Sequence, residues 1–162
     1  MNRLIISVAA ASAIFFSGGI LKAEAQTAKD FVGTWTLVSS VISKEGTKID
    51  TFGPNPSGTV MFGSDGHYAL IFLRSDLPKV ASGNRTSATP DEAQAIARGS
   101  IATFGTYTVE GKTIVIHIQG ATFPNWNGAE QHRAFSLSGD ELTYTSPGTT
   151  GVPTQVTVRR VK

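Results

Sequence analysis

The chain has 162 residues, of which 40% are hydrophobic and 16% are charged, and it contains no cysteine. Fourteen basic residues nearly balance twelve acidic ones, which argues against the cationic surface of a nucleic-acid-binding protein, so nucleic acid is not an expected partner. The lack of cysteine excludes disulfides and thiolate metal sites, so burial and hydrogen bonds must hold the fold together.

The first 25 residues have the pattern of a signal peptide. Arg3 provides a basic start, residues 4–20 are almost wholly apolar or small, and Ala23-Glu24-Ala25 matches the small-x-small pattern that signal peptidase reads. A retained membrane anchor is the weaker interpretation, because the apolar run is short and is followed by this cleavage pattern. We expect cleavage to leave one domain, residues 26–162, exported to the periplasm or secreted, with no stable membrane anchor.

The first strand of that domain is predicted at residues 31–42. Side chains alternate along a strand, so Trp35, Leu37, Ser39 and Val41 are expected on one face, with Val38 and Ile42 on the other. A glycine at position 33 leaves the backbone uncrowded where the large indole of Trp35 must cross the base of a core.

The rest of the domain reads mainly as short strands joined by tight turns. Apolar or alternating runs predict strands at 59–62, 67–74, 106–109, 113–118, 131–137, 141–145 and 155–161. One helix is predicted to begin at Thr89, which forms a capping box with Glu92, and its face of Ala93, Ile96, Ala97 and Ile101 is expected to pack on the domain. About eight strands and one short helix predict an all-β, antiparallel up-and-down barrel, whose interior has room for side chains or one small ligand.

Several short motifs occur together along the chain, in this order: Gly33-Thr34-Trp35, Phe52-Gly53-Pro54-Asn55-Pro56-Ser57-Gly58, Ser64-Asp65-Gly66-His67, Ser82-Gly83-Asn84-Arg85, Thr89-Pro90-Asp91-Glu92-Ala93, Phe104-Gly105-Thr106-Tyr107 and Phe123-Pro124-Asn125-Trp126. In this set the chain resembles the bacterial and fungal lipocalin-like domain family over nearly all of residues 31–162. The resemblance implies a calycin-type β-barrel with an internal cavity. It implies no particular activity, because members of the family mostly lack an assigned one.

The resemblance also implies a cationic residue on the closing strand that packs over the first-strand tryptophan and seals one end of the barrel. Arg160 is the better candidate than Arg159, because it shares a strand face with Val156 and Val158. Cation–π stacking on Trp35 and capping of backbone carbonyls are the physical reasons for this seal, and a solvated terminal arginine is the alternative.

The sequence lacks the common catalytic and metal-binding signatures. It contains no Gly-x-Ser-x-Gly elbow, Gly-rich phosphate loop or His-Glu-x-x-His motif. The three histidines, His67, His117 and His132, are not spaced two or four residues apart, so neither a metal site nor a cofactor is expected.

Two polar residues are predicted on the inner wall of the barrel. Gln131 and Arg133 share a strand face with Phe135 and Leu137, and a buried arginine costs several kcal/mol unless a polar group meets it. Two interpretations remain: the pair lies near the mouth, bonded to water or loop carbonyls, or it anchors the carboxylate or carbonyl of a ligand.

His117 and three aromatic residues complete the candidate set. His117 points into the cavity only if Ile114, Ile116 and Ile118 lie outside under the helix, and the sequence leaves both orientations open. Trp126 is either a platform at the mouth or a loop anchor. Tyr68 and Tyr107 are in phase with the apolar face of their strands, as is Tyr144, and the simplest interpretation of all three is that they are core residues.

These observations predict a binding protein for a small, apolar or amphipathic molecule with a polar end. Its predicted ligand-binding residues are Tyr68, Tyr107, His117, Trp126, Gln131 and Arg133, and its seal is Gly33, Trp35 and Arg160. The alternative is an isomerase, cyclase or hydratase on the same barrel, with His117 as base and Arg133 as oxyanion partner. A third possibility is a structural or interaction domain with a filled barrel.

Overall fold

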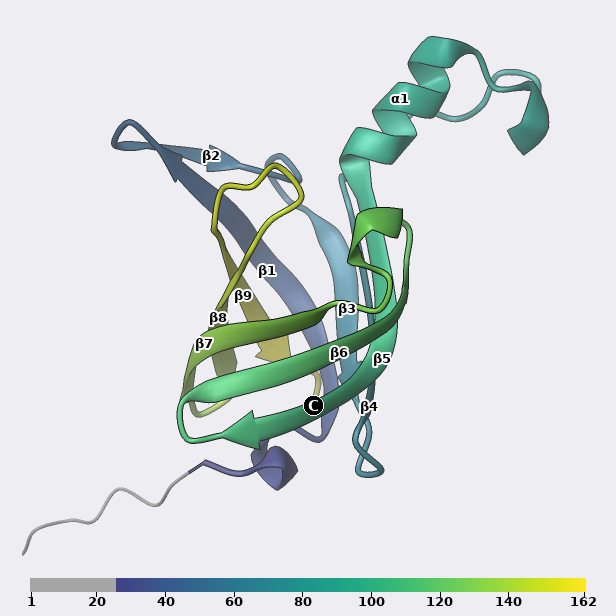
Figure 1. Cartoon of the computed structure of the whole chain (residues 1–162). Helices are drawn as coiled ribbons and strands as arrows, with labels where there is room; N and C mark the ends of the chain where they lie inside the picture. Colours follow the sequence, from purple (N-terminus) through teal and green to yellow (C-terminus); the bar gives the residue numbers. More distant parts are fainter. Residues whose placement is uncertain (1–25) are drawn as a thin grey trace, which may run out of the picture.

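The computed structural model describes residues 26–162, so the predicted signal peptide at residues 1–25 lies outside the described part of the chain (Figure 1). The strands are β1 (Gly33–Lys44), β2 (Thr47–Asp50), β3 (Ser57–Phe62), β4 (His67–Leu73), β5 (Ser100–Glu110), β6 (Thr113–Ala121), β7 (Glu130–Ser138), β8 (Glu141–Ser146) and β9 (Thr154–Arg160). The helices are α1 (Pro90–Gly99) and the short 3-10 turns η1 (Ala28–Asp30), η2 (Arg85–Ser87) and η3 (Pro124–Trp126).

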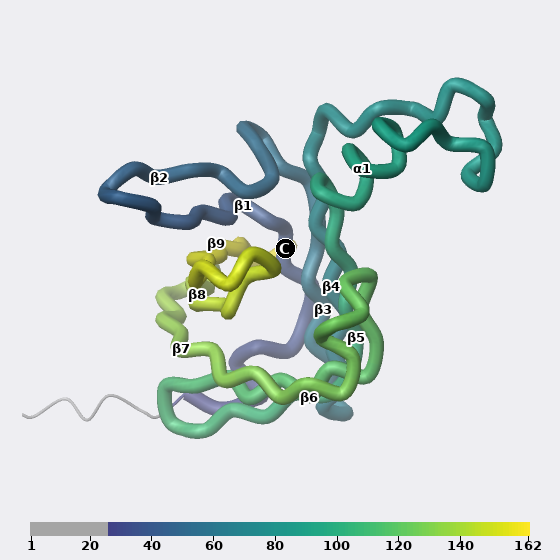
Figure 2. The backbone as a smooth tube through the Cα atoms, turned by 45° about the horizontal axis from the view of Figure 1, so that its top comes forward, coloured from purple at the N-terminus to yellow at the C-terminus, as the bar shows by residue number. Residues whose placement is uncertain are grey.

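The strands form one antiparallel sheet that closes on itself. Their order is β2-β1-β3-β4-β5-β6-β7-β8-β9, and an additional β1–β9 pairing closes the ring around a common interior (Figure 2). β2 pairs only with the last residues of β1, from Val41 to Lys44, and is therefore an arm outside the ring. The remaining eight strands make the predicted up-and-down barrel, and the single α-helix is also as predicted.

The face of β1 that points inward changes partway along the strand. The pairing of β1 with β9 shifts register between Leu37 and Ser39, as expected of a β-bulge that inserts one residue. Trp35 and Leu37 are buried before the shift, and Ser40 is buried after it. The prediction that Ser39 and Val41 share the face of Trp35 is therefore wrong beyond Leu37, because simple alternation does not continue through a bulge.

The helix begins as predicted but packs differently. The side chain of Thr89 accepts a hydrogen bond from the main-chain N–H of Glu92, whose carboxylate accepts one from the N–H of Thr89, so the capping box is complete. The predicted packing face is not formed, because α1 ends at Gly99, Ile101 belongs to β5, and Ala93 is exposed.

α1 extends away from the barrel at the end where β2 and the β8–β9 loop also lie (Figure 1). No helix within residues 26–162 has the length and apolar character needed to cross a membrane.

Candidate functional site

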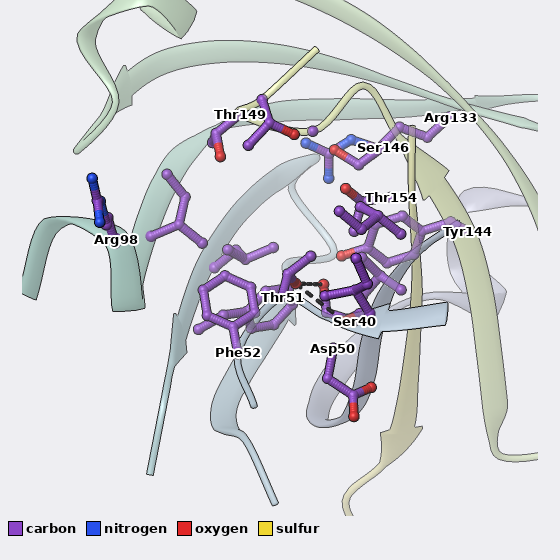
Figure 3. A pocket seen from close by; sticks show the side chains of 18 of the residues that line it. Ser40, Asp50, Thr51, Phe52, Arg98, Arg133, Tyr144, Ser146, Thr149 and Thr154 are labelled. Atoms are coloured by element: carbon purple, nitrogen blue, oxygen red, sulfur yellow. Dashed lines mark hydrogen bonds between the residues drawn. The ribbon is translucent and has the colours of Figure 1, made fainter. Parts of the chain in front are cut away.

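A cavity of about 270 Å³ occupies the end of the barrel that carries β2, α1 and the β8–β9 loop (Figure 3). The mouth is formed by Ile49 and Asp50 of β2, Arg98 near the end of α1, and Thr149 and Thr150 of the β8–β9 loop. Asp50, Arg98 and both threonines are exposed. The rim of the cavity therefore includes a carboxylate, a guanidinium and two hydroxyls beside the exposed side chain of Ile49.

One side of the cavity is apolar. Leu70 and Phe72 of β4 and Ile101 of β5 are buried and line it. Phe52 extends this wall toward the mouth, with its ring 6.0 Å from that of Phe72 in an edge-to-face contact. Trp126 also lines the cavity, and its ring packs edge-to-face on that of Phe123 with the ring centres 5.6 Å apart.

The opposite side carries hydroxyl groups on three neighbouring strands. Ser40 of β1, Ser146 of β8 and Thr154 of β9 are all buried and line the cavity, and Ser146 lies opposite Thr154 in the strand pairing. Thr51, which follows β2, donates a hydrogen bond of 2.7 Å to the Ser40 hydroxyl. A molecule in the cavity would thus meet hydrocarbon on one side and hydrogen-bonding oxygens on the other.

Arg133 of β7 brings a buried guanidinium to this site. The residue is only 4% exposed, and its Nε and Nη2 donate to the amide oxygen of Gln131 at 3.2 and 2.7 Å. Among residues 26–162, no carboxylate lies within ion-pair distance of Arg133. Its positive charge is therefore buried with a neutral partner, and it lines the cavity beside Ser146 (Figure 3).

Tyr144 of β8 stands next to this guanidinium. The Cζ of Arg133 lies 5.4 Å from the centre of the Tyr144 ring, in a cation–π contact. The Tyr144 hydroxyl is the one buried side-chain polar atom in the described part of the chain that has no hydrogen-bond partner. Burial raises the pKa of Tyr144 to about 12, although the neighbouring guanidinium acts in the opposite direction. The phenol is therefore neutral at ordinary pH.

The other predicted ligand-binding residues divide into two groups. Gln131 is buried against Arg133, while Tyr68 donates a 3.2 Å hydrogen bond to Thr103, and both lie close to Arg133 without lining the cavity themselves. Tyr107 lies elsewhere: its hydroxyl donates to the carbonyl of Gly63 at 3.0 Å near the closed end of the barrel. The prediction that Tyr107 lines the cavity is therefore not supported.

His117 points outward. Ile116 and Ile118 are buried inside β6, whereas the His117 side chain is 51% exposed and its Nδ1 lies 3.2 Å from Glu130. His132 contacts the same carboxylate at 2.7 Å on the outer face of the sheet. His117 and Arg133 therefore lie on opposite faces of the barrel wall, and the enzyme alternative lacks its proposed base. No group of three potential metal ligands is present within residues 26–162.

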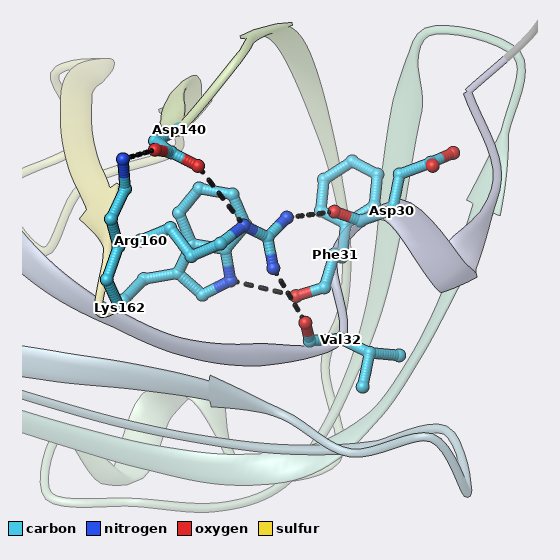
Figure 4. Close-up of polar contacts among 7 residues, drawn as sticks. Asp30, Phe31, Val32, Asp140, Arg160 and Lys162 are labelled. Carbon is cyan, nitrogen blue, oxygen red and sulfur yellow. Dashed lines mark hydrogen bonds and ion pairs between the residues drawn. The ribbon is translucent and has the colours of Figure 1, made fainter.

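The predicted seal is present at the other end of the barrel. Trp35 is completely buried and its indole N–H donates to the carbonyl of Phe31 at 2.8 Å. The guanidinium carbon of Arg160 lies 4.1 Å from the Trp35 ring centre, and the same group donates to the carbonyls of Val32, at 2.7 Å, and Asp30 (Figure 4). Arg160 thus ties the start of the domain onto its last strand.

A glycine is needed where this seal closes. Gly33 has φ of +129°, and a Cβ at this position would approach Nη1 of Arg160 to 3.3 Å. Asp140 adds charge complementarity, because its carboxylate lies 2.9 Å from Lys162 and 3.9 Å from Arg160 (Figure 4). The end near Trp35 is therefore closed by stacking, hydrogen bonds and ion pairs.

The fold and cavity define a hollow antiparallel β-barrel with one sealed end. A sequence profile of the lipocalin-like domain matches residues 32–157, and the chain belongs to this family. None of the curated proteins compared with the chain matches it.

Several solved barrels resemble the chain distantly. A redesigned β-barrel is 15% identical with a TM-score of 0.46, covering 86% of this chain and 98% of its own. Fatty-acid-binding protein 1 of Echinococcus granulosus is 14% identical with a TM-score of 0.38, covering 83% and 99%. The wild-type fluorescent protein UnaG is also 14% identical with a TM-score of 0.38, covering 82% and 98%.

Proposed function

We propose that this protein is a binding protein that holds a small, largely apolar molecule with a polar end inside its barrel. The observation that carries the proposal is the internal cavity of about 270 Å³, which a barrel filled by its own side chains would lack. The apolar wall of Leu70, Phe72 and Ile101 supports binding by burial of hydrocarbon. The buried donors of Arg133 support a polar group on the ligand.

The size of the cavity limits the size of the ligand. A dry cavity of about 150 Å³ accommodates one benzene molecule, so a cavity of the present size suits about eleven non-hydrogen atoms. A longer molecule would have to extend through the mouth between β2 and the β8–β9 loop. The expected ligands are therefore compact.

Equilibrium dialysis with 2-methoxynaphthalene, a neutral apolar compound close to this size, tests the proposal. Saturable binding at one molecule per chain is expected. Leu70→Trp, which puts an indole into the cavity, should abolish it, whereas the matched variant Ile71→Trp should not, because Ile71 is 43% exposed on the outer face of the same strand. No saturable binding to the parent protein, or equal binding by both variants, would contradict the proposal.

We also propose that the protein acts after export, in the periplasm or outside the cell. The basic start, the apolar run and the Ala23-Glu24-Ala25 pattern support this proposal. The intact mass of the protein recovered from the exported fraction should correspond to a chain that begins at Gln26. Recovery of a chain that retains Met1 would contradict it.

A further inference from the structure

We infer that the ligand is a compact organic acid whose carboxylate binds between the guanidinium of Arg133 and the hydroxyl of Tyr144. This inference rests on the proposed binding function and specifies the chemistry of its ligand. It is carried by two buried, incompletely partnered polar groups that meet at the same cavity.

The first group is the guanidinium of Arg133. It has only hydrogen-bond donors, and the bonds to Gln131 use Nε and part of Nη2, so Nη1 and the rest of Nη2 have no partner within residues 26–162. An arginine stays charged when buried, and a buried charge without a counter-charge is unfavourable. A ligand that supplies acceptor oxygens and a negative charge would satisfy both requirements, and a carboxylate does so in a planar arrangement that matches the guanidinium.

The second group is the hydroxyl of Tyr144. It is buried, unpartnered and close to Arg133. A buried hydroxyl without a partner costs stability, so its presence beside the guanidinium calls for a partner that arrives with the ligand. A neutral phenol can donate to a carboxylate oxygen, which places a second donor at the same point of the cavity wall.

The remaining lining explains why a compact acid fits better than a long-chain fatty acid. The hydroxyls of Ser40 and Thr154 already bond to Thr51 and to the carbonyl of Val152. An alkyl chain in the cavity would leave the buried hydroxyl of Ser146 facing hydrocarbon, which is unfavourable. A chain much longer than about eleven atoms would also extend past the mouth into solvent. A compact, oxygen-substituted acid can use the hydroxyl-bearing strands and the apolar wall together.

Isothermal titration calorimetry with 6-hydroxy-2-naphthoate, its methyl ester and palmitate tests these steps. The parent protein should bind the naphthoate more tightly than the ester by about 30-fold and more tightly than palmitate. Arg133→Leu should remove most of the difference between acid and ester. The control Arg159→Leu should preserve the difference, because Arg159 is exposed and contacts Glu141 at 3.3 Å.

Tyr144→Phe provides a readout that a purely structural role would not produce. Removing the unpartnered hydroxyl should raise the melting temperature of the ligand-free protein by about 3 °C while weakening the binding of the naphthoate by about tenfold. The control Tyr107→Phe should lower the melting temperature, because it removes a satisfied hydrogen bond to Gly63, and should leave naphthoate affinity unchanged.

The outcomes separate this inference from the proposed function. Equal affinities for acid and ester, or equal losses of both in Arg133→Leu, would show that Arg133 supports the wall without recognising a carboxylate, and would overturn the inference while leaving the binding function intact. A loss of stability in Tyr144→Phe without a loss of affinity, or tighter binding of palmitate, would also overturn it. Failure of 2-methoxynaphthalene to bind would instead contradict the binding function itself.

Discussion

Replacing Trp35 and Arg160 one at a time and then together should reveal an energetic coupling between β1, the first strand of the barrel, and β9, the last. Trp35 is completely buried, so Trp35→Ala should lower the free energy of unfolding by about 3–5 kcal/mol. Arg160→Ala removes hydrogen bonds to two main-chain carbonyls, but its side chain is 27% exposed, so a smaller loss of about 2 kcal/mol is expected. With the guanidinium 4.1 Å from the ring centre, the stack itself should contribute about 1 kcal/mol.

A double-mutant cycle measured by urea unfolding, followed by far-ultraviolet circular dichroism, gives this coupling directly. The double variant should be less destabilised than the sum of the two single variants by about 1 kcal/mol. Arg159→Ala provides the control, because Arg159 lies on the opposite face of β9 and its effect should add to that of Trp35→Ala. A coupling indistinguishable from zero for Trp35 and Arg160 would refute the stack as a stabilising contact.

Three further predictions concern the N-terminus of α1, the close pairing of β5 with β6, and the outer face of the barrel. Hydrogen bonds from the main-chain N–H groups of Ala81 and Thr89 lower the pKa of Glu92, so its stabilisation of α1 is present above the ordinary carboxyl pKa and is lost as the pH falls through the pKa of the folded state. On acidification, amide hydrogen exchange in α1 should therefore accelerate before exchange in the barrel strands. Equal acceleration in both would contradict this prediction. Gly105→Ala should lower the melting temperature, because a Cβ there would overlap the carbonyl oxygen of His117, and an unchanged value would show that the strands can separate. His117→Ala should leave the affinity for 6-hydroxy-2-naphthoate unchanged in calorimetry, and a large loss of affinity would show that the histidine reaches the cavity.

The barrel was predictable because strand alternation and turn residues are local, periodic information that identifies the strands. The seal was implied by the family resemblance, and the phase of Arg160 with Val156 and Val158 selected it over Arg159 as the residue that stacks on Trp35. The phase of Arg133 with Phe135 likewise placed its guanidinium inside, where it is buried.

The features that the sequence did not reveal depend on contacts between distant segments. The bulge after Leu37 brings Ser40 inward, and nothing in the local sequence Val38-Ser39-Ser40 identifies the position of the extra residue. Tyr144 was predicted as ordinary core, because only the assembled barrel shows that its hydroxyl lacks a partner and that the residue lines a cavity. For His117, isoleucines and valine compete for the inner face of β6, and the choice depends on the strands that flank it.

The two tryptophans offer the most direct test of binding inside the barrel. The chain contains only Trp35 and Trp126, and they lie at the sealed end and beside the cavity, respectively. A proton–nitrogen correlation spectrum recorded while 6-hydroxy-2-naphthoate is added therefore reports both sites at once. The account predicts that the indole resonance of Trp126 shifts and saturates at one ligand per chain while that of Trp35 stays nearly fixed. Saturation that shifts Trp35 and leaves Trp126 unmoved, or no saturable shift of either resonance, would contradict it.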